Sequence, residues 1–181
     1  MNITKLITIK KSLEALVPVP AMEIDYVPEI FHNPKDKKNG AKRLDWAYSQ
    51  IKKKNPNSPI GNIIINRSCI NNSLHKGFNR YKAGLYPVLD KLIECSVLIF
   101  TNTDAIGKRQ YILGSKYIRN EGIGYVGIVI KVDKDGNKYY SHTIYQKISR
   151  AARSGTGNQS QTLKLHPTVQ SILHEILTVN N

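Results

Sequence analysis

A β-hairpin expected over residues 124–147 constrains the fold more than any other part of this chain. Two runs rich in Val, Ile and Tyr flank Asp135-Gly136. Asp-Gly between such runs is typical of a type I′ turn, in which both central residues take a positive φ. A loop of two or four residues pairs Val132 with Tyr139, Ile130 with Ser141, Ile128 with Thr143, and Val126 with Tyr145. Alternation puts these side chains on one face, which we expect to be core.

The opposite face of the hairpin is the first candidate for a functional surface. It carries Tyr125, Gly127, Val129, Lys131, Tyr140 and His142. A histidine and a cation stand here among tyrosines, and the glycine leaves room for another molecule to approach. This pattern is typical of an open surface that binds phosphate groups.

Hydrophobic periodicity outlines the remaining elements. Helical spacing predicts helices over residues 2–16, 41–54, 82–94 and 167–177, with a turn or short helix at 73–76. Apolar runs at 96–100 and 109–118 predict two strands ahead of the hairpin, and four consecutive strands favour an antiparallel meander. We therefore expect an α+β fold, with N-terminal helices on one face of a four-stranded antiparallel sheet and a C-terminal helix.

The Asn-Pro-Asn-Ser-Pro run at 55–59 is expected to divide the chain. Residues of these types break regular structure. We predict a helical and irregular extension over residues 1–59 and an α+β domain over residues 60–181, which is long enough to bury a core.

Charge points to a polyanionic partner. The chain has 27 Lys and Arg against 13 Asp and Glu, a formal net charge of +14. Such an excess favours nucleic acid, while an acidic protein, a membrane surface, or charge that only keeps the protein soluble stay open as alternatives. No apolar run approaches the roughly 20 residues of a membrane-spanning helix. Lysines interrupt the N-terminal apolar residues, so conventional secretion is not indicated.

The cysteines and carboxylates do not suggest a metal site. Cys69 and Cys95 each have apolar neighbours, which favours two buried thiols in a reducing compartment. No zinc-ligand spacing is present. Acidic residues are sparse and unclustered, whereas a two-metal nuclease needs several convergent carboxylates. We expect neither a metal nor a cofactor, and any phosphodiester chemistry should be metal-independent.

Two histidines are candidates for that chemistry. Metal-free RNA cleavage needs a base for the 2′-hydroxyl, an acid for the leaving 5′-oxygen and fixed cations, and histidine can fill either proton-transfer role. His142 and His75 are the candidates, with Lys131 and Arg119 as cations. The alternatives are a strand histidine stacked on Tyr140 and a solvated loop histidine at position 75.

Further cations and tyrosines are candidates for RNA contacts. The cations are Lys76, Arg80, Lys82, Arg150 and Arg153, and the tyrosines are Tyr117, Tyr125 and Tyr140. The hydroxyl of Thr156 is a further candidate for a phosphate contact. Tyrosines can stack on unpaired bases, although tyrosine also simply suits sheets. Alternation puts Lys116 opposite Tyr117 and Arg119, so only one of these sets can join the site, and we favour Tyr117 with Arg119.

The order of motifs resembles a known nuclease superfamily. INRSCINNSLHKG, a helix ending in LIECSVLIF, a strand like YILGSKYI, the hairpin VGIVIKVDKDGNKYYSHTIYQK and a terminal SILHEIL follow one another from about Ile63 to Leu177. This succession is similar to the phage-associated branch of the barnase, EndoU, colicin and RelE-like superfamily, found in phage polyproteins and polymorphic toxins. The resemblance rests on order and texture, and residues 1–59 have no part in it.

The resemblance implies helices ahead of a four-stranded antiparallel sheet that binds RNA on its uncovered face, with His75 and His142 at catalytic positions. We therefore expect a metal-independent endoribonuclease of toxin or effector type that acts by 2′-oxygen attack to leave a cyclic phosphate. Its expected partners are tRNA or other single-stranded or loop RNA and a cognate acidic inhibitor, with a cytoplasmic site of action after delivery into a target or host cell. A non-catalytic nucleic-acid-binding module and an effector that binds an acidic protein stay open.

Overall fold

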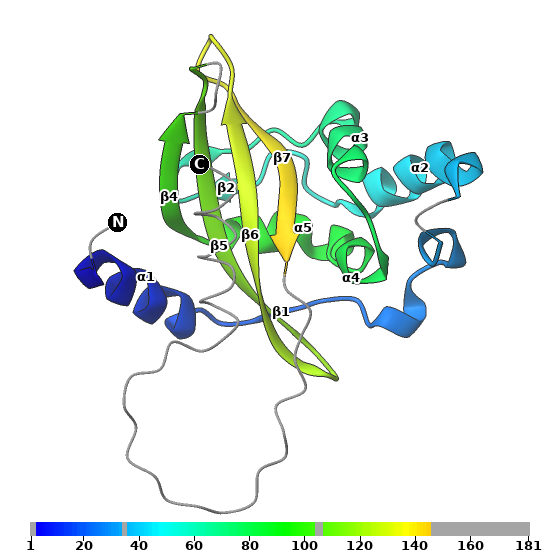
Figure 1. The fold of residues 1–181 in the computed structure, drawn as a ribbon, viewed down its shortest axis with the longest axis horizontal. Coiled ribbons are helices and arrows are strands. Elements are labelled where there is room, and N and C mark those ends of the chain that lie inside the picture. Colours follow the sequence, from blue (N-terminus) through cyan, green and yellow to red (C-terminus); the bar gives the residue numbers. More distant parts are fainter. Residues whose placement is uncertain (1–2, 34–35, 104–106, 146–181) are drawn as a thin grey trace, which may run out of the picture.

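The structure is a computed structural model that describes residues 3–33, 36–103 and 107–145 (Figure 1). The helix expected over 167–177, and Arg150, Arg153 and Thr156, lie outside these residues. None of the described helices combines the length and apolarity that a bilayer crossing requires.

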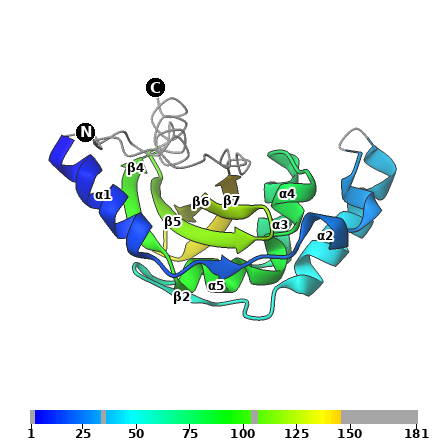
Figure 2. The same ribbon diagram turned by 90° about the horizontal axis from the view of Figure 1, so that it is seen from below.

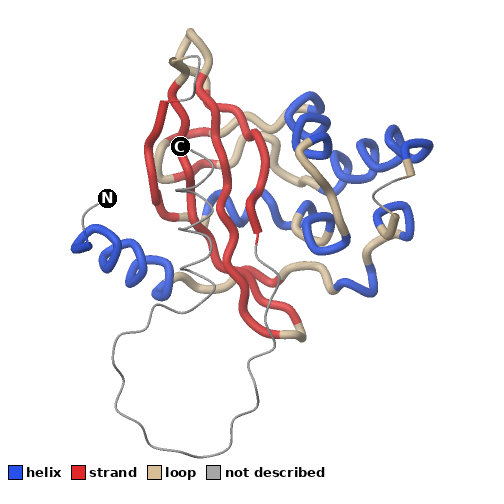
Figure 3. The backbone as a smooth tube through the Cα atoms, viewed as in Figure 1, coloured by secondary structure: helices blue, strands red, loops and turns tan. Residues whose placement is uncertain are grey.

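The centre of the fold is one sheet that combines both strand directions. The long strands are β4 (Val97–Thr103), β5 (Arg109–Arg119), β6 (Gly122–Val132) and β7 (Lys138–Tyr145). Each is antiparallel to the next, as expected for a meander (Figure 3). A fifth strand, β1 (Val19–Pro20), pairs in parallel with β5 at Tyr117 and Ile118. The sheet is therefore mixed and five-stranded rather than antiparallel and four-stranded.

Strand β1 could not be predicted from the sequence, because it has only two residues, one of them Pro20, and shows no alternation. Strand β5 carries both β4 and β1 along one edge, at its start and near its end respectively, while β6 pairs along the other edge. A separate hairpin joins β2 (Asn57–Ser58) to β3 (Gly61–Asn62).

The helices form close to where periodicity predicts them, but with different limits. They are α1 (Ile3–Ala15), α2 (Gly40–Gln50), α3 (Arg67–His75), α4 (Arg80–Ala83) and α5 (Leu89–Glu94). Short 3₁₀ turns occupy Ile24–Tyr26, Glu29–Phe31, Lys37–Asn39 and Tyr86–Val88. Helix α3 replaces the expected turn at 73–76 because the Asn66 side chain accepts a hydrogen bond from Cys69 N–H and begins the helix earlier.

Two predicted helices are shorter than expected. The single helix over 82–94 is divided into α4, a 3₁₀ turn and α5, because Gly84 ends α4 and Pro87 lacks the amide donor of a continuous helix. Helix α2 ends at Gln50 rather than residue 54. Lys54 folds back there, and its Nζ donates to Ile51 O at 2.7 Å and Tyr48 O at 2.5 Å.

The β6–β7 turn has three residues rather than two or four. Asp133 N–H donates to Asn137 O at 3.0 Å, and Gly136 N–H donates to Asp133 O at 3.2 Å. In this fully described loop only Gly136 has a positive φ, of 84°. The turn is therefore type I followed by a glycine bulge, not type I′. Next to the turn the register is shifted by one, so that Ile130 pairs with Tyr140.

A bulge at Ser141 restores the expected register further along the hairpin. Ile130 pairs with Tyr140 but Val129 pairs with His142, so Ser141 is the extra residue. Two expected pairs beyond the bulge are confirmed: Ile128 with Thr143, and Val126 with Tyr145. The bulge also changes which face Tyr140 occupies. Tyr140 lies in the core, with 1% of its surface exposed, and not beside His142 as expected.

Both faces of the sheet pack against helices. The face with Val126, Ile128 and Ile130 packs on buried residues of α2, α3 and α5, which confirms the expected core face. On the other face, Ile9 and Leu13 of α1 pack with Ile99, Ile112 and Tyr125. This face is therefore partly covered rather than open. Figure 2 shows α5 beneath the sheet, with α1 and α2 at opposite ends of the molecule.

Residues on both sides of the predicted boundary at 59/60 share one core. Val19, Ala47 and Ile51 belong to the same buried cluster as Leu113 and Val126 of the sheet. The division of the chain into extension and domain stays a prediction, but the helices before residue 60 pack on the same sheet as those after it.

Candidate nucleic-acid site at strand β7 and helix α3

His142 lies on β7 where this strand faces positively charged residues. It pairs with Val129 of β6, and its ring Nδ1 is 3.1 Å from Ser141 Oγ. The side chain is half-buried. Burial, followed by the positive charges of Lys76, Lys82 and Lys131, lowers the pKa of His142 to about 4. The imidazole is therefore neutral near pH 7 and can accept a proton.

The three lysines differ in what they can contact. Lys76 is exposed at the end of α3, and Lys131 is partly exposed on β6. Lys82 is buried, and its Nζ donates to Ser73 O at 2.7 Å and Gly77 O at 2.8 Å. Burial, followed by the charge of Lys76, lowers the pKa of Lys82 to about 8. Lys82 therefore secures the end of α3, whereas the side chains of Lys76 and Lys131 are at least partly exposed to solvent.

A groove of about 270 Å³ lies between α3 and β7. Its lining residues are Asn66, Ser68, Cys69, Asn72, Lys131, Tyr139, Tyr140 and Ser141. Hydroxyls, amides and one lysine dominate this list, which is the chemistry that suits a phosphate or ribose. Sequence reasoning missed Asn66, Asn72 and Ser141; an asparagine just before a helical stretch was the one available signal.

Hydrogen bonds between buried hydroxyls fix α3 against β7. Tyr140 Oη is 2.9 Å from Ser73 Oγ, and Tyr86 Oη donates to the same oxygen at 3.3 Å. Burial raises the pKa of Tyr140. The Tyr140 ring has no exposed face for a base, so its assignment as a stacking residue is wrong. It instead holds the strand that carries His142.

The choice of Tyr117 and Arg119 for the site is also wrong, because both lie on the core face. Tyr117 is fully buried. Arg119 is 4% exposed, and its guanidinium donates to Met22 O at 2.8 Å and Tyr81 O at 2.8 Å. Lys116 does lie on the opposite face, as alternation requires, but its Nζ donates to Glu14 O of α1 at 2.9 Å.

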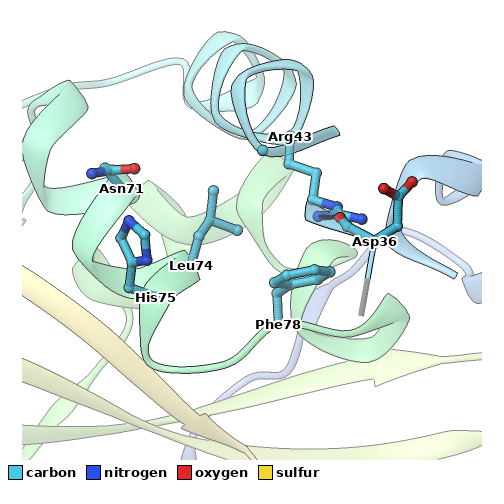
Figure 4. A pocket seen from close by; sticks show the side chains of 7 residues that line it. Asp36, Arg43, Asn71, Leu74, His75 and Phe78 are labelled. Carbon is cyan, nitrogen blue, oxygen red and sulfur yellow. Dashed lines mark hydrogen bonds between the residues drawn. The ribbon is translucent and has the colours of Figure 1, made fainter. Parts of the chain in front are cut away.

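Other predicted site residues are not at the groove. Tyr125 is 7% exposed in the cluster beneath α1, and burial raises its pKa. Arg80 Nη2 donates to Ile24 O at 3.1 Å and lies 3.5 Å from Asp25 Oδ1. His75 is exposed at the end of α3 and lines a different pocket, toward α2 (Figure 4). His142 is not among the residues that line this pocket.

The cysteines are not both buried. Cys69 is buried beside the groove, and burial raises the pKa of its thiol. Cys95 is exposed, at the end of α5, contrary to expectation. Within the described ranges, no cluster of three His, Cys, Asp or Glu side chains could hold a metal ion.

Comparisons with protein-family models, curated proteins and solved structures gave no match.

Proposed function

We propose that this protein is a metal-independent endoribonuclease that binds RNA along the groove between α3 and β7. The observation that carries the proposal is His142, whose neighbour Ser141 lines the groove and whose pKa is lowered by burial and by the charges of Lys76, Lys82 and Lys131, on a chain of net charge +14. A neutral histidine next to cations combines a proton acceptor with charges that attract phosphate. This pairing is also consistent with the resemblance to the barnase and EndoU superfamily.

The proposed reaction begins with proton transfer from the 2′-hydroxyl to His142. The 2′-oxygen then attacks the adjacent phosphorus, and the 5′-oxygen leaves with a proton from solvent, which gives a 2′,3′-cyclic phosphate. Lys76 and Lys131 stabilise the negative charge that builds up on the phosphate oxygens. His75 has no acid role in this reaction, because it lines the pocket toward α2.

Cleavage of total RNA in EDTA by wild type and His142→Ala tests this proposal. We expect wild-type cleavage to persist in EDTA and to leave cyclic phosphate ends. His142→Ala should lower the rate by about two to four orders of magnitude, the usual contribution of a general base. His32→Ala removes an exposed histidine that is distant from His142 in the sequence, and it should leave the rate unchanged.

Binding is measured separately with an RNA that carries 2′-O-methyl groups and cannot undergo this attack. Affinity should fall with salt at a log–log slope of about −0.7 per phosphate contact. Lys131→Gln should flatten the slope by roughly one contact, whereas Lys52→Gln, an equal charge change at an exposed site, should not. Wild-type cleavage that stops in EDTA would contradict the mechanism.

A non-catalytic RNA-binding module is the second candidate. The lining of the groove favours it, because neither His142 nor His75 is among the residues that line it. Salt-dependent RNA binding without cleavage under any condition would establish this alternative.

A further inference from the structure

A second pocket lies on the other side of α3, between this helix and α2. It has a volume of about 540 Å³, within the range of small-molecule sites. Asn71, Leu74 and His75 of α3 line one side, Arg43 and Asp36 line the other, and Phe78 lies below them (Figure 4). The function proposed above makes no use of this pocket.

The charged groups in this pocket argue against a phosphate inside it. Arg43 is 3% exposed, and its guanidinium donates to Ile30 O at 2.5 Å, Asp36 O at 2.6 Å and Asn33 O at 2.9 Å. Three of its five N–H donors are engaged with backbone carbonyls and the side chain is almost fully buried, so it has little left to offer a phosphate. The Asp36 carboxylate adds a negative charge to the wall, which repels an anion.

The remaining lining suits a flat, neutral ring with polar edges. Phe78 is partly exposed, and the Arg43 guanidinium lies 4.1 Å from its ring centroid. This stack provides an aromatic and cationic wall of the kind that bases contact. Asn71 and His75 are exposed side chains at the rim. An amide and an imidazole can both donate and accept hydrogen bonds, as the edge of a nucleobase requires.

The pocket also lies next to the proposed phosphate-binding residues. His75 lines it, while the following residue, Lys76, lies close enough to His142 to lower the pKa of that ring. Lys42 is exposed and directly precedes Arg43. Each of these lysines is thus next in the chain to a residue that lines the pocket.

We propose that the pocket between α2 and α3 binds one unpaired nucleobase of RNA, with Asn71 and His75 hydrogen-bonded to its edge. The inference rests on the proposed RNA binding and adds a base-recognition site to it.

The test compares two polyanions that differ in whether they carry bases. The probe is a labelled ten-nucleotide RNA with 2′-O-methyl groups, and inorganic polyphosphate serves as the competitor without bases. Asn71→Ala/His75→Ala should weaken RNA binding about tenfold, roughly the effect of losing two hydrogen bonds. Its affinity for polyphosphate and its salt slope should equal those of wild type.

Asn62→Ala/His32→Ala is the matched control, because it removes the same two exposed side-chain types outside the pocket. Equal weakening toward both polyanions, or unchanged RNA affinity in Asn71→Ala/His75→Ala, would overturn the nucleobase pocket while leaving the proposed RNA binding intact. Failure of wild type to bind the RNA would overturn both. Thermal unfolding of each variant establishes that it is folded.

Discussion

Buried cations in this protein bind backbone carbonyls. Arg43 donates to three of them, and Arg119 and Lys82 to two each. These side chains tie the ends of helices and the N-terminal segment to the fold, as charged donors commonly do when carboxylates are scarce. A formal charge of +14 therefore overstates the number of cations available to RNA. Sequence alone could not separate these structural cations from exposed ones such as Lys76.

His142 should make stability depend on pH. Its pKa in the folded protein is about 4, below the ordinary value of 6.5. Between these values the unfolded chain binds the proton and the folded protein does not, so acid favours unfolding. The destabilisation is absent above about pH 6.5, grows as pH falls, and is complete below about pH 4.

Urea unfolding of wild type and His142→Gln at several pH values between 7.5 and 4.5 measures this effect. Wild type should lose more stability than the variant over this interval, because glutamine does not titrate. Parallel curves for the two proteins would show that the ring titrates near its ordinary pKa.

Two glycines of β6 should respond oppositely to the same substitution. A Cβ on Gly124 would lie 2.5 Å from Tyr117 Oη and closer still to Tyr117 Cζ. Tyr117 is fully buried and cannot easily move, so we expect Gly124→Ala to lower the free energy of unfolding by about 1–3 kcal/mol. Chemical denaturation measures the change.

Gly127→Ala is the control within the same strand. Its added Cβ would lie 3.7 Å from Ile144 Cβ, an ordinary contact. Alanine also costs less conformational entropy than glycine, so stability should stay level or rise by roughly 0.5–1 kcal/mol. Equal destabilisation by both substitutions would contradict the packing of Tyr117 on Gly124.

The meander was predictable at the level of elements because its strands alternate and follow one another closely. The hairpin shows where such reasoning stops. Its three-residue turn shifts the register by one, and the bulge at Ser141 shifts it back. The two irregularities cancel, so Ile128 pairs with Thr143 as expected. Between them, the side chain of Tyr140 faces the core. Neither irregularity has a signal in the residues themselves.

The candidate site was predicted in part. His142 and Lys131 lie near one another, as alternation on neighbouring strands required. Lys76 could be proposed only from local charge, since its approach to β7 depends on how α3 packs. His75 lines the pocket toward α2 and not the groove, which depends on how α3 packs and has no signal in the sequence.

Helix α1 should contribute to stability across the whole molecule through the second core. Leu13 is 1% exposed against Ile99 and Tyr125, whereas Ile7 of the same helix is 44% exposed. Leu13→Ala should lower the free energy of unfolding by about 2–4 kcal/mol. Ile7→Ala should lower it by less than about 1 kcal/mol. Chemical denaturation of both variants gives the comparison, and a small effect at Leu13 would mean that α1 is not packed on the sheet.

The pairing of β1 with β5 has a consequence in time. Val19 is synthesised before the whole meander, and its partner Tyr117 follows only in β5, the second of the four long strands. The first helix and strand therefore have no surface to pack on until the sheet exists, and contacts that close so long a loop form late. We expect amide protons of α1 to exchange with solvent before those of β6, because the element that forms last also unfolds locally at the lowest free-energy cost. Helix α1 and strand β1 are thus expected to be the last elements that pack onto the sheet.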